Sequence, residues 1–380
     1  MNILITGGAG FIGSHTADAL IKNGHQVRVL DNLQKTVHPK GKPSYLNPAV
    51  EFIQGDVRRK SDWERALVGM DAVYHLAAYQ DYLTDFSSFF HTNAVSTALL
   101  YEVLLETGQY RDMRKVIVAA SQAVMGEGRY HCPACDPEAK APIYPQIRSE
   151  TQLAQGQWEH TCAACRQNLQ WLPSDESVIQ PCNQYALSKH SQEQITLQLG
   201  RRYDIPSVVM RYSIVQGPRQ SFYNAYSGAM RIFALALYFD KAPTIFEDGC
   251  QVRDFVNIND VVAANLLVLE HAQVDFREFN VGGGQVWTVQ GFYEAMQAIT
   301  GKQIDPIISG YYRFGDTRHI FSDTTRLQSL GWQATRSVQT SIEAYWSYLN
   351  QQQDMEDILA YAQKHMQTLN VIRQIGTTSA

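Results

Sequence analysis

The sequence lacks any uninterrupted apolar stretch near the roughly 18 residues that mark a transmembrane helix. Its densest apolar run, residues 232–239, has the length of a buried strand or of about two helical turns. No cationic segment precedes an apolar one at the N-terminus, which argues against a secretory signal. We therefore expect a cytoplasmic protein without a membrane partner.

An excess of charge of one sign is also lacking. The 380 residues include 32 basic and 37 acidic side chains, so the net charge is −5 at pH 7. This balance excludes a strongly basic nucleic-acid binder. The chain is 45% hydrophobic and 18% charged, as globular proteins are. A chain of this length can bury a substantial core without disulfides.

Short apolar runs alternate with helical patterns along most of the chain. Strands are predicted at residues 2–6, 26–30, 50–53, 72–76, 115–120 and 207–211, and helices at residues 62–68 and 93–105 among others. Strands that alternate with helices indicate a parallel sheet covered on both faces. The fold class is therefore α/β.

A glycine-rich turn, residues 7–13, separates the first strand from the first helix. Glycines let the backbone approach a pyrophosphate, and the helix N-terminus stabilises its negative charge. Asp31 ends the second strand, where a carboxylate accepts hydrogen bonds from ribose hydroxyls and repels a 2′-phosphate. NAD is therefore favoured over NADP. Asn32, Asp56 and Val57 are expected beside the adenosine, although a polar strand end also explains the last two.

Three polar residues have the spacing of a catalytic set. Tyr185 and Lys189 are four positions apart and share one helix face. A nearby ammonium lowers the pKa of a tyrosine, which enables Tyr185 to take a proton from a sugar hydroxyl. Ser121 ends a strand where it can hold the same oxygen. The alternatives are a solvated helix face and a serine that caps a turn.

Together these residues resemble the extended short-chain dehydrogenase/reductase family, in particular its nucleotide-sugar epimerases. The matching positions are Gly7, Gly10, Gly13, Asp31–Leu33, Gly55–Val57, His75–Ala78, Asn93, Ser121, Tyr185, Lys189, Arg211, Gly217–Pro218, Arg253–Val256, Arg313–Asp316 and Leu330–Trp332. The resemblance covers residues 1–350 apart from an insertion. It implies a Rossmann-type doubly wound parallel sheet with a smaller α/β substrate domain.

The resemblance also implies the binding residues. NAD would be bound by Gly7, Gly10, Phe11, Ile12, Gly13, Asp31, Asn32, Asp56, Val57, Leu76, Ala77, Ala78, Asn93, Tyr185 and Lys189. The sugar would lie near Gln80, Tyr82 and Ser121, and the substrate diphosphate would contact Arg253 and Arg313. The alternative for these arginines is an ion pair with Asp254 or Asp316. The helices that begin near Asn93 and Tyr185 form the dimer interface in the family, so a homodimer is expected.

Some positions depart from the family pattern. Ile214 stands where relatives often carry an asparagine for the diphosphate, and Met125 stands where a tyrosine is common. Gln122 and Ala123 follow the catalytic hydroxyl in place of the acidic pair of the dehydratases. Elimination of water is hard to run without an acid or base there. An epimerase is therefore favoured.

The region between Ser121 and Tyr185 is far longer than in ordinary family members. It contains the pattern C-x2-C-x26-C-x2-C, formed by Cys132, Cys135, Cys162 and Cys165. Four thiolates suit a tetrahedral, structural zinc. A redox pair and unbound thiols are the alternatives. His131 could replace one ligand, but a solvated histidine is the preferred interpretation.

The insertion has little apolar periodicity of its own. A small cluster of Trp158, Trp171, Leu153 and Leu169 beside the metal is expected, and the insertion is expected to shape or cap the sugar pocket. The insertion resembles that of a subgroup that includes the dTDP-L-rhamnose 4-epimerases.

Four regions are predicted. These are an NAD-binding domain (1–126 and 181–212), a zinc-ribbon-like insertion (127–180), a substrate-binding domain that can share strands with the first (213–350) and a C-terminal helical extension (351–380). The function expected is NAD-dependent epimerisation of a nucleotide-diphosphate sugar at C4, through a 4-keto intermediate, on a dTDP-L-rhamnose-type or UDP-hexose substrate. The alternatives are a 4-ketosugar reductase or related oxidoreductase, and a non-catalytic NAD-sensing protein.

Overall fold

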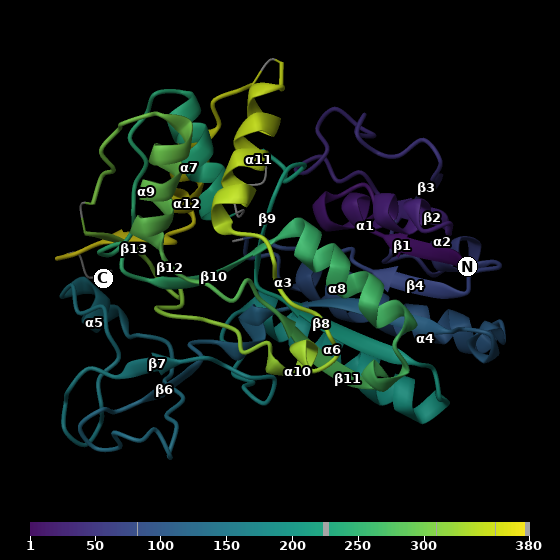
Figure 1. The fold of residues 1–380 in the computed structure, drawn as a ribbon, viewed down its shortest axis with the longest axis horizontal. Helices are drawn as coiled ribbons and strands as arrows, with labels where there is room; N and C mark the ends of the chain where they lie inside the picture. The colour runs from purple at the N-terminus through teal and green to yellow at the C-terminus, as the bar shows by residue number, and fades with distance from the viewer. Residues whose placement is uncertain (82, 223–227, 309, 354, 377–380) are drawn as a thin grey trace.

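The computed structural model describes residues 1–81, 83–222, 228–308, 310–353 and 355–376. At its centre is a seven-stranded parallel sheet with the order β11-β8-β5-β4-β1-β2-β3 (Figure 1). The strands are β1 (Asn2–Thr6), β2 (Gln26–Asp31), β3 (Glu51–Gln54), β4 (Ala72–His75), β5 (Lys115–Ser121), β8 (Ser207–Tyr212) and β11 (Arg277–Val281). The predicted Rossmann-type sheet is confirmed.

Helices cover both faces of this sheet. Alternate residues of β1 show why: Ile3 and Ile5 are buried with α1 (Phe11–Lys22) and α8 (Ile258–Glu270), whereas Leu4 is buried on the other side. That second face is covered by α2 (Lys60–Leu67), α4 (Ser96–Glu106) and α6 (Gln184–Tyr203). Successive strand residues point to opposite faces, so two apolar layers form from near-continuous apolar strands.

A smaller lobe follows β8. Its sheet has the order β12-β10-β9, built from β9 (Ile214–Gln216), β10 (Val252–Asn257) and β12 (Val286–Thr288). Helices α7 (Ala229–Tyr238), α9 (Val289–Thr300) and α11 (Val338–Asn350) supply most of its separate core. Because β11 joins the large sheet, the chain that follows β8 contributes a strand to that sheet as well as forming the smaller lobe.

Several short elements connect these parts. They are α3 (Phe86–Phe89), the π-helix η1 (Phe90–Val95), the 3-10 helices η2 (Gln109–Arg111), η3 (Gln122–Met125) and η4 (Ala272–Val274), α10 (Thr325–Gln328) and β13 (Tyr311–Arg313). The π-helix runs directly into α4 and packs against α6.

The insertion lies beside the smaller lobe, at the end of the molecule away from the N-terminus (Figure 1). It contains β6 (Arg129–His131), α5 (Glu150–Ala154) and β7 (Gln170–Leu172), and β6 pairs antiparallel with β7. Backbone hydrogen bonds such as Gln180 N to Val124 O (2.8 Å) and Ser174 N to Phe321 O (2.8 Å) attach it to the remaining structure.

The C-terminal stretch differs from the helical extension expected over residues 351–380. Helix α11 ends at Asn350, α12 (Leu359–Thr368) begins later, and the last element within the described residues is a strand, β14 (Ile372–Gln374), paired antiparallel with β13. The polar run at residues 351–354 gives a continued helix no apolar face to bury. The extension is therefore helical only in part.

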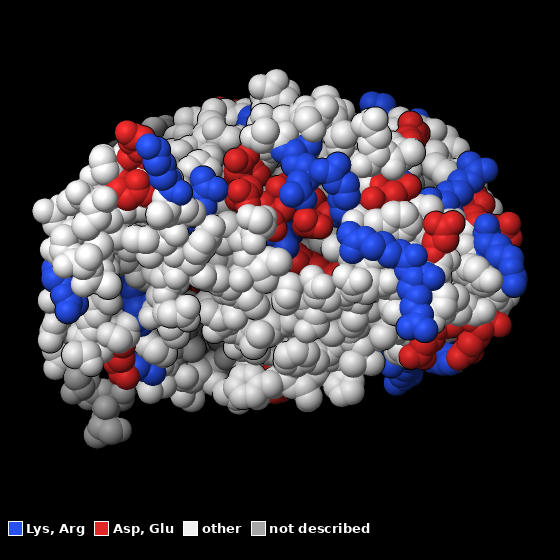
Figure 2. Space-filling view, turned by 90° about the horizontal axis from the view of Figure 1, so that it is seen from below, with Lys and Arg blue, Asp and Glu red and all other residues white. Residues whose placement is uncertain are grey.

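The charged surface is mixed on the face drawn in Figure 2, where lysines and arginines lie beside aspartates and glutamates around large uncharged areas. Among the described residues, no helix has both the length and the apolar character needed to cross a membrane.

Candidate active site

The glycine turn forms a backbone cradle at the carboxyl ends of the strands. Gly7 has a φ of 66°, and a Cβ there would lie 2.8 Å from the backbone of Ala77. A Cβ at Gly13 would lie 2.4 Å from the carbonyl oxygen of Gly7. Only glycine fits these two places. Such a cradle, followed directly by the N-terminus of α1, fits a pyrophosphate.

A cavity of about 350 Å³ opens beside this cradle. Its lining includes the predicted residues Gly7, Gly10, Phe11, Ile12, Gly13, Asp31, Asn32, Asp56, Val57, Leu76, Ala77 and Ala78. The structure thus brings together twelve of the residues proposed for NAD, from four separate strand ends. These residues fit a dinucleotide.

Asp31 is held at the floor of this cavity. Its carboxylate accepts hydrogen bonds from the backbone N–H groups of Ala9 (3.0 Å) and Leu33 (2.8 Å). The side chain is buried, and this burial raises its pKa. These two hydrogen bonds fix the carboxylate in the lining of the cavity, and a carboxylate there suits ribose hydroxyls and disfavours a 2′-phosphate.

Arg58 also lines the cavity, and sequence reasoning missed it. Its guanidinium pairs with the Asp56 carboxylate, with an Nη2–Oδ2 distance of 2.6 Å, and Asn32 donates to the same oxygen at 3.4 Å. Burial opposes ionisation of Asp56, but the hydrogen bonds from Arg58 outweigh it and lower the pKa. The Asp56–Arg58 spacing of two residues was the available signal.

Asn93, also proposed for NAD, makes three hydrogen bonds within the protein. Its amide donates to Ser188 Oγ (2.9 Å) and to Tyr79 O (3.1 Å), and its oxygen accepts from Tyr79 N (2.9 Å). The residue is fully buried in the π-helix. It therefore joins the loop after β4 to helix α6.

Ser121, Tyr185 and Lys189 lie on neighbouring elements. Ser121 ends β5, and the Lys189 ammonium donates to Ala119 O of the same strand at 2.8 Å. The ammonium lies 6.0 Å from the centre of the Tyr185 ring. Burial lowers the pKa of Lys189 to about 7. The shared helix face predicted for Tyr185 and Lys189 is present, and it faces the serine strand.

Two buried pairs hold the catalytic helix, and neither was predicted. Gln192 accepts from Lys189 Nζ (2.9 Å) and donates to Thr97 (3.0 Å), which links α6 to α4. Arg211 of β8 forms a bidentate ion pair with Glu193, at 2.7 and 2.9 Å. Charged pairs of this kind fix geometry more than they stabilise. Polar residues on the buried face of α6 were the available signal.

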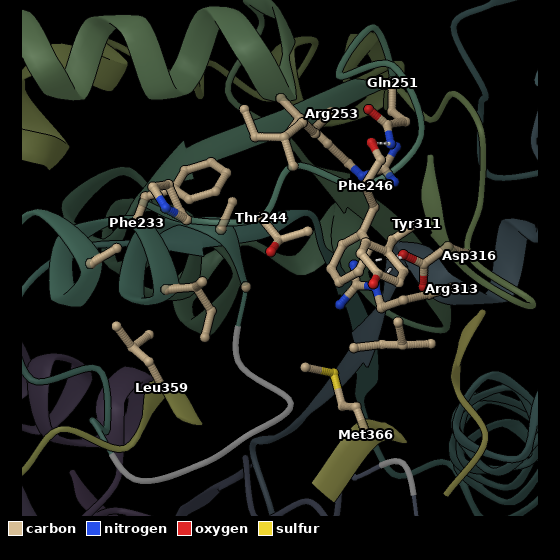
Figure 3. A pocket seen from close by; sticks show the side chains of 18 of the residues that line it. Phe233, Thr244, Phe246, Gln251, Arg253, Tyr311, Arg313, Asp316, Leu359 and Met366 are labelled. Carbon is tan, nitrogen blue, oxygen red and sulfur yellow. Dashed lines mark hydrogen bonds and ion pairs between the residues drawn. The ribbon is translucent and has the colours of Figure 1, made fainter. Parts of the chain in front are cut away.

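A second cavity of about 330 Å³ lies in the smaller lobe (Figure 3). Arg253 and Arg313, the two residues predicted to contact a substrate diphosphate, both line it. Arg313 also pairs with Asp316 (Nη2–Oδ2 2.6 Å), which is the alternative raised for it. Arg253 instead donates to the backbone carbonyls of Val252, Thr317 and Arg318, at 2.8–3.0 Å.

The other residues predicted near the sugar, and the residues that depart from the family pattern, lie in different parts of the structure. Ile214 contributes an apolar side chain to the second cavity, where relatives often carry an amide. Met125 is fully buried in a cluster with Val124, Val178 and Ile320. Gln80 is exposed, and Tyr82 lies outside the described residues.

The four cysteines of the insertion form one cluster. Their sulfur atoms all lie within 4.8 Å of one another, with Cys132–Cys165 at 3.5 Å and Cys135–Cys162 at 3.9 Å. Tetrahedral Zn–S bonds of about 2.3 Å place sulfurs about 3.8 Å apart, so the donor set and its spacing fit zinc. Backbone N–H groups of Cys165 and Ala164 lower the pKa of Cys162 to about 6.

The surroundings of the cluster correct two expectations. His131 is buried and its ring contacts Asp136 O (3.1 Å) and Gln170 Oε1 (3.2 Å), so it is not a solvated histidine. The apolar cluster consists of Tyr130, Leu169, Ile143 and Trp171 with the cysteines. Trp158 packs against Tyr312 of β13 instead. The β6–β7 pairing brings Tyr130 beside Trp171, which local sequence does not reveal.

A phosphate-binding turn, an acidic second strand end and a serine–tyrosine–lysine set at one sheet edge define a dinucleotide-dependent enzyme of the short-chain dehydrogenase/reductase type. The chain belongs to the NAD dependent epimerase/dehydratase family, whose model matches residues 3–148 and 161–282. The unmatched gap falls within the insertion and includes α5.

The individual relatives and solved structures that the chain resembles include several nucleotide-sugar 4-epimerases. A dTDP-L-rhamnose 4-epimerase from Burkholderia thailandensis is 29% identical, over 93% of this chain and 96% of that protein. The structure of a UDP-glucose 4-epimerase from Thermotoga maritima with UDP-glucose has a TM-score of 0.74 and 29% identity, over 92% and 99% of the two chains. A UDP-glucuronic acid 4-epimerase from Bacillus cereus, solved with UDP-glucuronic acid and NAD, gives 0.72 and 26% with the same coverage.

Proposed function

We propose that this protein is an NAD-dependent epimerase that inverts C4 of a nucleotide-diphosphate sugar. The proposal is supported by the hydrogen bond from Lys189 to β5, the strand that Ser121 ends, by the place of Lys189 beside the Tyr185 ring, and by the cavity suited to NAD. The named relatives act on dTDP- or UDP-linked sugars, so a dTDP-L-rhamnose-type or UDP-hexose substrate is expected.

The roles follow from the chemistry of each side chain. Tyr185 takes the proton of the C4 hydroxyl and returns it when the sugar is reduced again. Lys189, in its charged form, favours the phenolate of Tyr185, and Ser121 donates a hydrogen bond to the reacting oxygen. When bound, NAD supplies reversible hydride transfer. Arg253 and Arg313 bind the diphosphate.

The deciding experiment incubates purified protein with UDP-, dTDP-, GDP- and CDP-sugars and identifies products by NMR. We expect a C4 epimer to form with NAD bound and unconsumed. Stoichiometric consumption of NADH would favour the ketosugar reductase. Binding of a sugar nucleotide without turnover, unaffected by Tyr185→Phe, would favour the non-catalytic sensor.

We also propose that Cys132, Cys135, Cys162 and Cys165 hold one structural zinc ion, supported by the spacing of their sulfurs. Four protein ligands leave no open position for substrate. Elemental analysis should find about one zinc per chain, and Cys135→Ser should release it. Retention of stoichiometric metal in that variant would contradict the assignment.

We also propose that the protein forms a homodimer. Val95 and Leu187 are 42% and 45% exposed, on the elements expected to form the interface. Light scattering on purified protein should give twice the chain mass, and Leu187→Glu should reduce it. A monomer in the unmodified protein would overturn this proposal.

A further inference from the structure

One wall of the second cavity comes from the C-terminal segment. Leu359, Ala360 and Met366 from α12 and Ile372 from β14 line it together with aromatic residues of the smaller lobe, such as Phe233 and Phe246. In Figure 3, Leu359 and Met366 lie across the cavity from Arg253. The catalytic residues Ser121, Tyr185 and Lys189 are not among the lining residues. The cavity therefore extends from the arginines to a side away from the reacting sugar.

Pairing between β13 and β14 sets the position of the wall. Ile372 is opposite Arg313, one of the two cavity arginines. The next residue, Arg373, lies over the ring of Phe314 at 4.5 Å and pairs with Glu150 of α5 at 2.5 Å. Successive residues of a strand point to opposite sides. Ile372 thus faces the cavity while Arg373 attaches the strand to the insertion.

Other contacts hold both ends of the segment. Before α12, Asp357 pairs with Lys241, which itself lines the cavity. After β14, Gly376 N donates to Ala154 O of α5 at 2.9 Å. Met366 is only 7% exposed, and its carbonyl accepts from Val371 N at 3.0 Å. The wall is therefore held by contacts with the smaller lobe, with α5 and within the C-terminal segment itself.

We propose that Leu359, Met366 and Ile372 form a specificity-determining wall for the nucleoside of the substrate, and that α5 of the cysteine insertion holds this wall in place. The inference rests on the proposed function, because it assumes that the arginines bind the diphosphate. A diphosphate at Arg253 and Arg313 has the sugar on one side and the nucleoside on the other. The apolar side chains of the wall and the rings of the smaller lobe suit the flat faces of a pyrimidine base.

The test measures binding of UDP and dTDP to the holoenzyme by calorimetry. The variant Met366→Ala/Ile372→Ala removes the wall, and Lys364→Ala, exposed on the same helix, is the matched control. We expect at least about tenfold weaker nucleotide binding in the double variant, since each lost apolar contact in a pocket costs about that factor. The control should bind as wild type does, and the NAD content should not change.

Further measurements separate a lost wall from lost folding. The volume-conserving Met366→Leu should keep near-normal nucleotide affinity. With a sugar nucleotide, the double variant should raise KM far more than it lowers kcat, since the catalytic set is elsewhere. Unchanged affinity for both nucleotides in the double variant would overturn this inference alone. If wild-type protein binds neither nucleotide, the dTDP- or UDP-linked substrate expected under the proposed function is wrong, and the sugar-nucleotide panel then tests the epimerase activity separately.

The role of the insertion has its own test. Glu150→Gln removes the charge that faces Arg373 but leaves every wall residue in place. We expect nucleotide binding to weaken in the same direction by a smaller factor. Wild-type affinity for UDP and dTDP in Glu150→Gln would show that α5 does not hold the wall.

Discussion

The cavity beside the glycine turn and the second cavity, in the smaller lobe, are built in different ways. The first is lined by short motifs that each follow a strand of one sheet, and its residues were recognisable one motif at a time. The second takes its lining from the smaller lobe and the C-terminal segment, which the insertion in turn supports. If the second cavity binds the nucleotide as we propose, the C-terminal segment and the insertion act on substrate recognition and not on the cofactor site.

The largest expected effect comes from a substitution that removes the proton-transfer group and leaves both cavities intact. Tyr185→Phe should lower the epimerisation rate by about 10³-fold, the range expected when a proton-transfer group is lost. NAD content and UDP affinity should stay at wild-type values. Tyr203→Phe, at the other end of α6, is the matched control. NMR turnover assays check both, and wild-type turnover in Tyr185→Phe would reverse the assignment.

The next largest effect is expected from removal of the metal, which should affect binding at the second cavity more than binding at the NAD cavity. A structural zinc site contributes about 10 kcal/mol or more to folding of its segment. Chelation, or Cys132→Ser, should therefore weaken nucleotide-sugar binding and loosen substrate selectivity before NAD is lost. Cys182→Ser and Cys250→Ser, at exposed cysteines outside the cluster, serve as controls. Equal loss of cofactor and substrate binding on chelation would break the comparison.

A substitution in the glycine turn should affect NAD binding directly, whereas metal removal should affect substrate binding first. Gly13→Ala places a Cβ 2.4 Å from the Gly7 carbonyl oxygen, so the turn must shift. We expect loss of bound NAD and about 1–3 kcal/mol of stability, as overpacked sites show. At Gly10 the corresponding distance is 3.2 Å, so Gly10→Ala should lower stability less. Absorbance of released cofactor and thermal melting measure the two effects.

The smallest expected effect concerns the ion pairs between the insertion and the smaller lobe. Glu159 contacts Arg318 (2.5 Å) and His319 (3.0 Å). Burial opposes its ionisation, but hydrogen bonds to these partners outweigh it and lower the pKa of Glu159 to about 2. The stabilisation is thus present above a pH of about 4.5 and is lost as the pH falls toward about 2.

Glu159→Gln should remove about 2 kcal/mol at neutral pH, where Arg318 is left buried with one partner fewer. The difference from wild type should shrink as the pH approaches about 2. Glu138→Gln, in an exposed pair with Lys140, is the control and should change little. Denaturant melts across this pH range provide the measurement, and a constant difference would contradict the assigned pKa shift.

Local motifs allowed much of this structure to be predicted. The glycine turn, Asp31 and the Tyr185–Lys189 spacing each depend on residues within one element or one turn. The positions of Asn93, His131 and Trp158 could not be predicted, because each is set by a partner distant in the sequence. Their contacts with Tyr79, Gln170 and Tyr312 form only after the segments pack.

By itself, the sequence determined the parallel sheet, the dinucleotide cradle, the catalytic set and the four clustered thiols, because hydrophobic period, glycine geometry and i,i+4 spacing are local properties. Only the tertiary structure decided that the C-terminal segment forms a strand beside Arg313 and lines the second cavity. It also decided that Glu150 of the insertion lies behind that strand. Strand pairing and ion pairing between distant segments depend on how the chain packs, which no local pattern records.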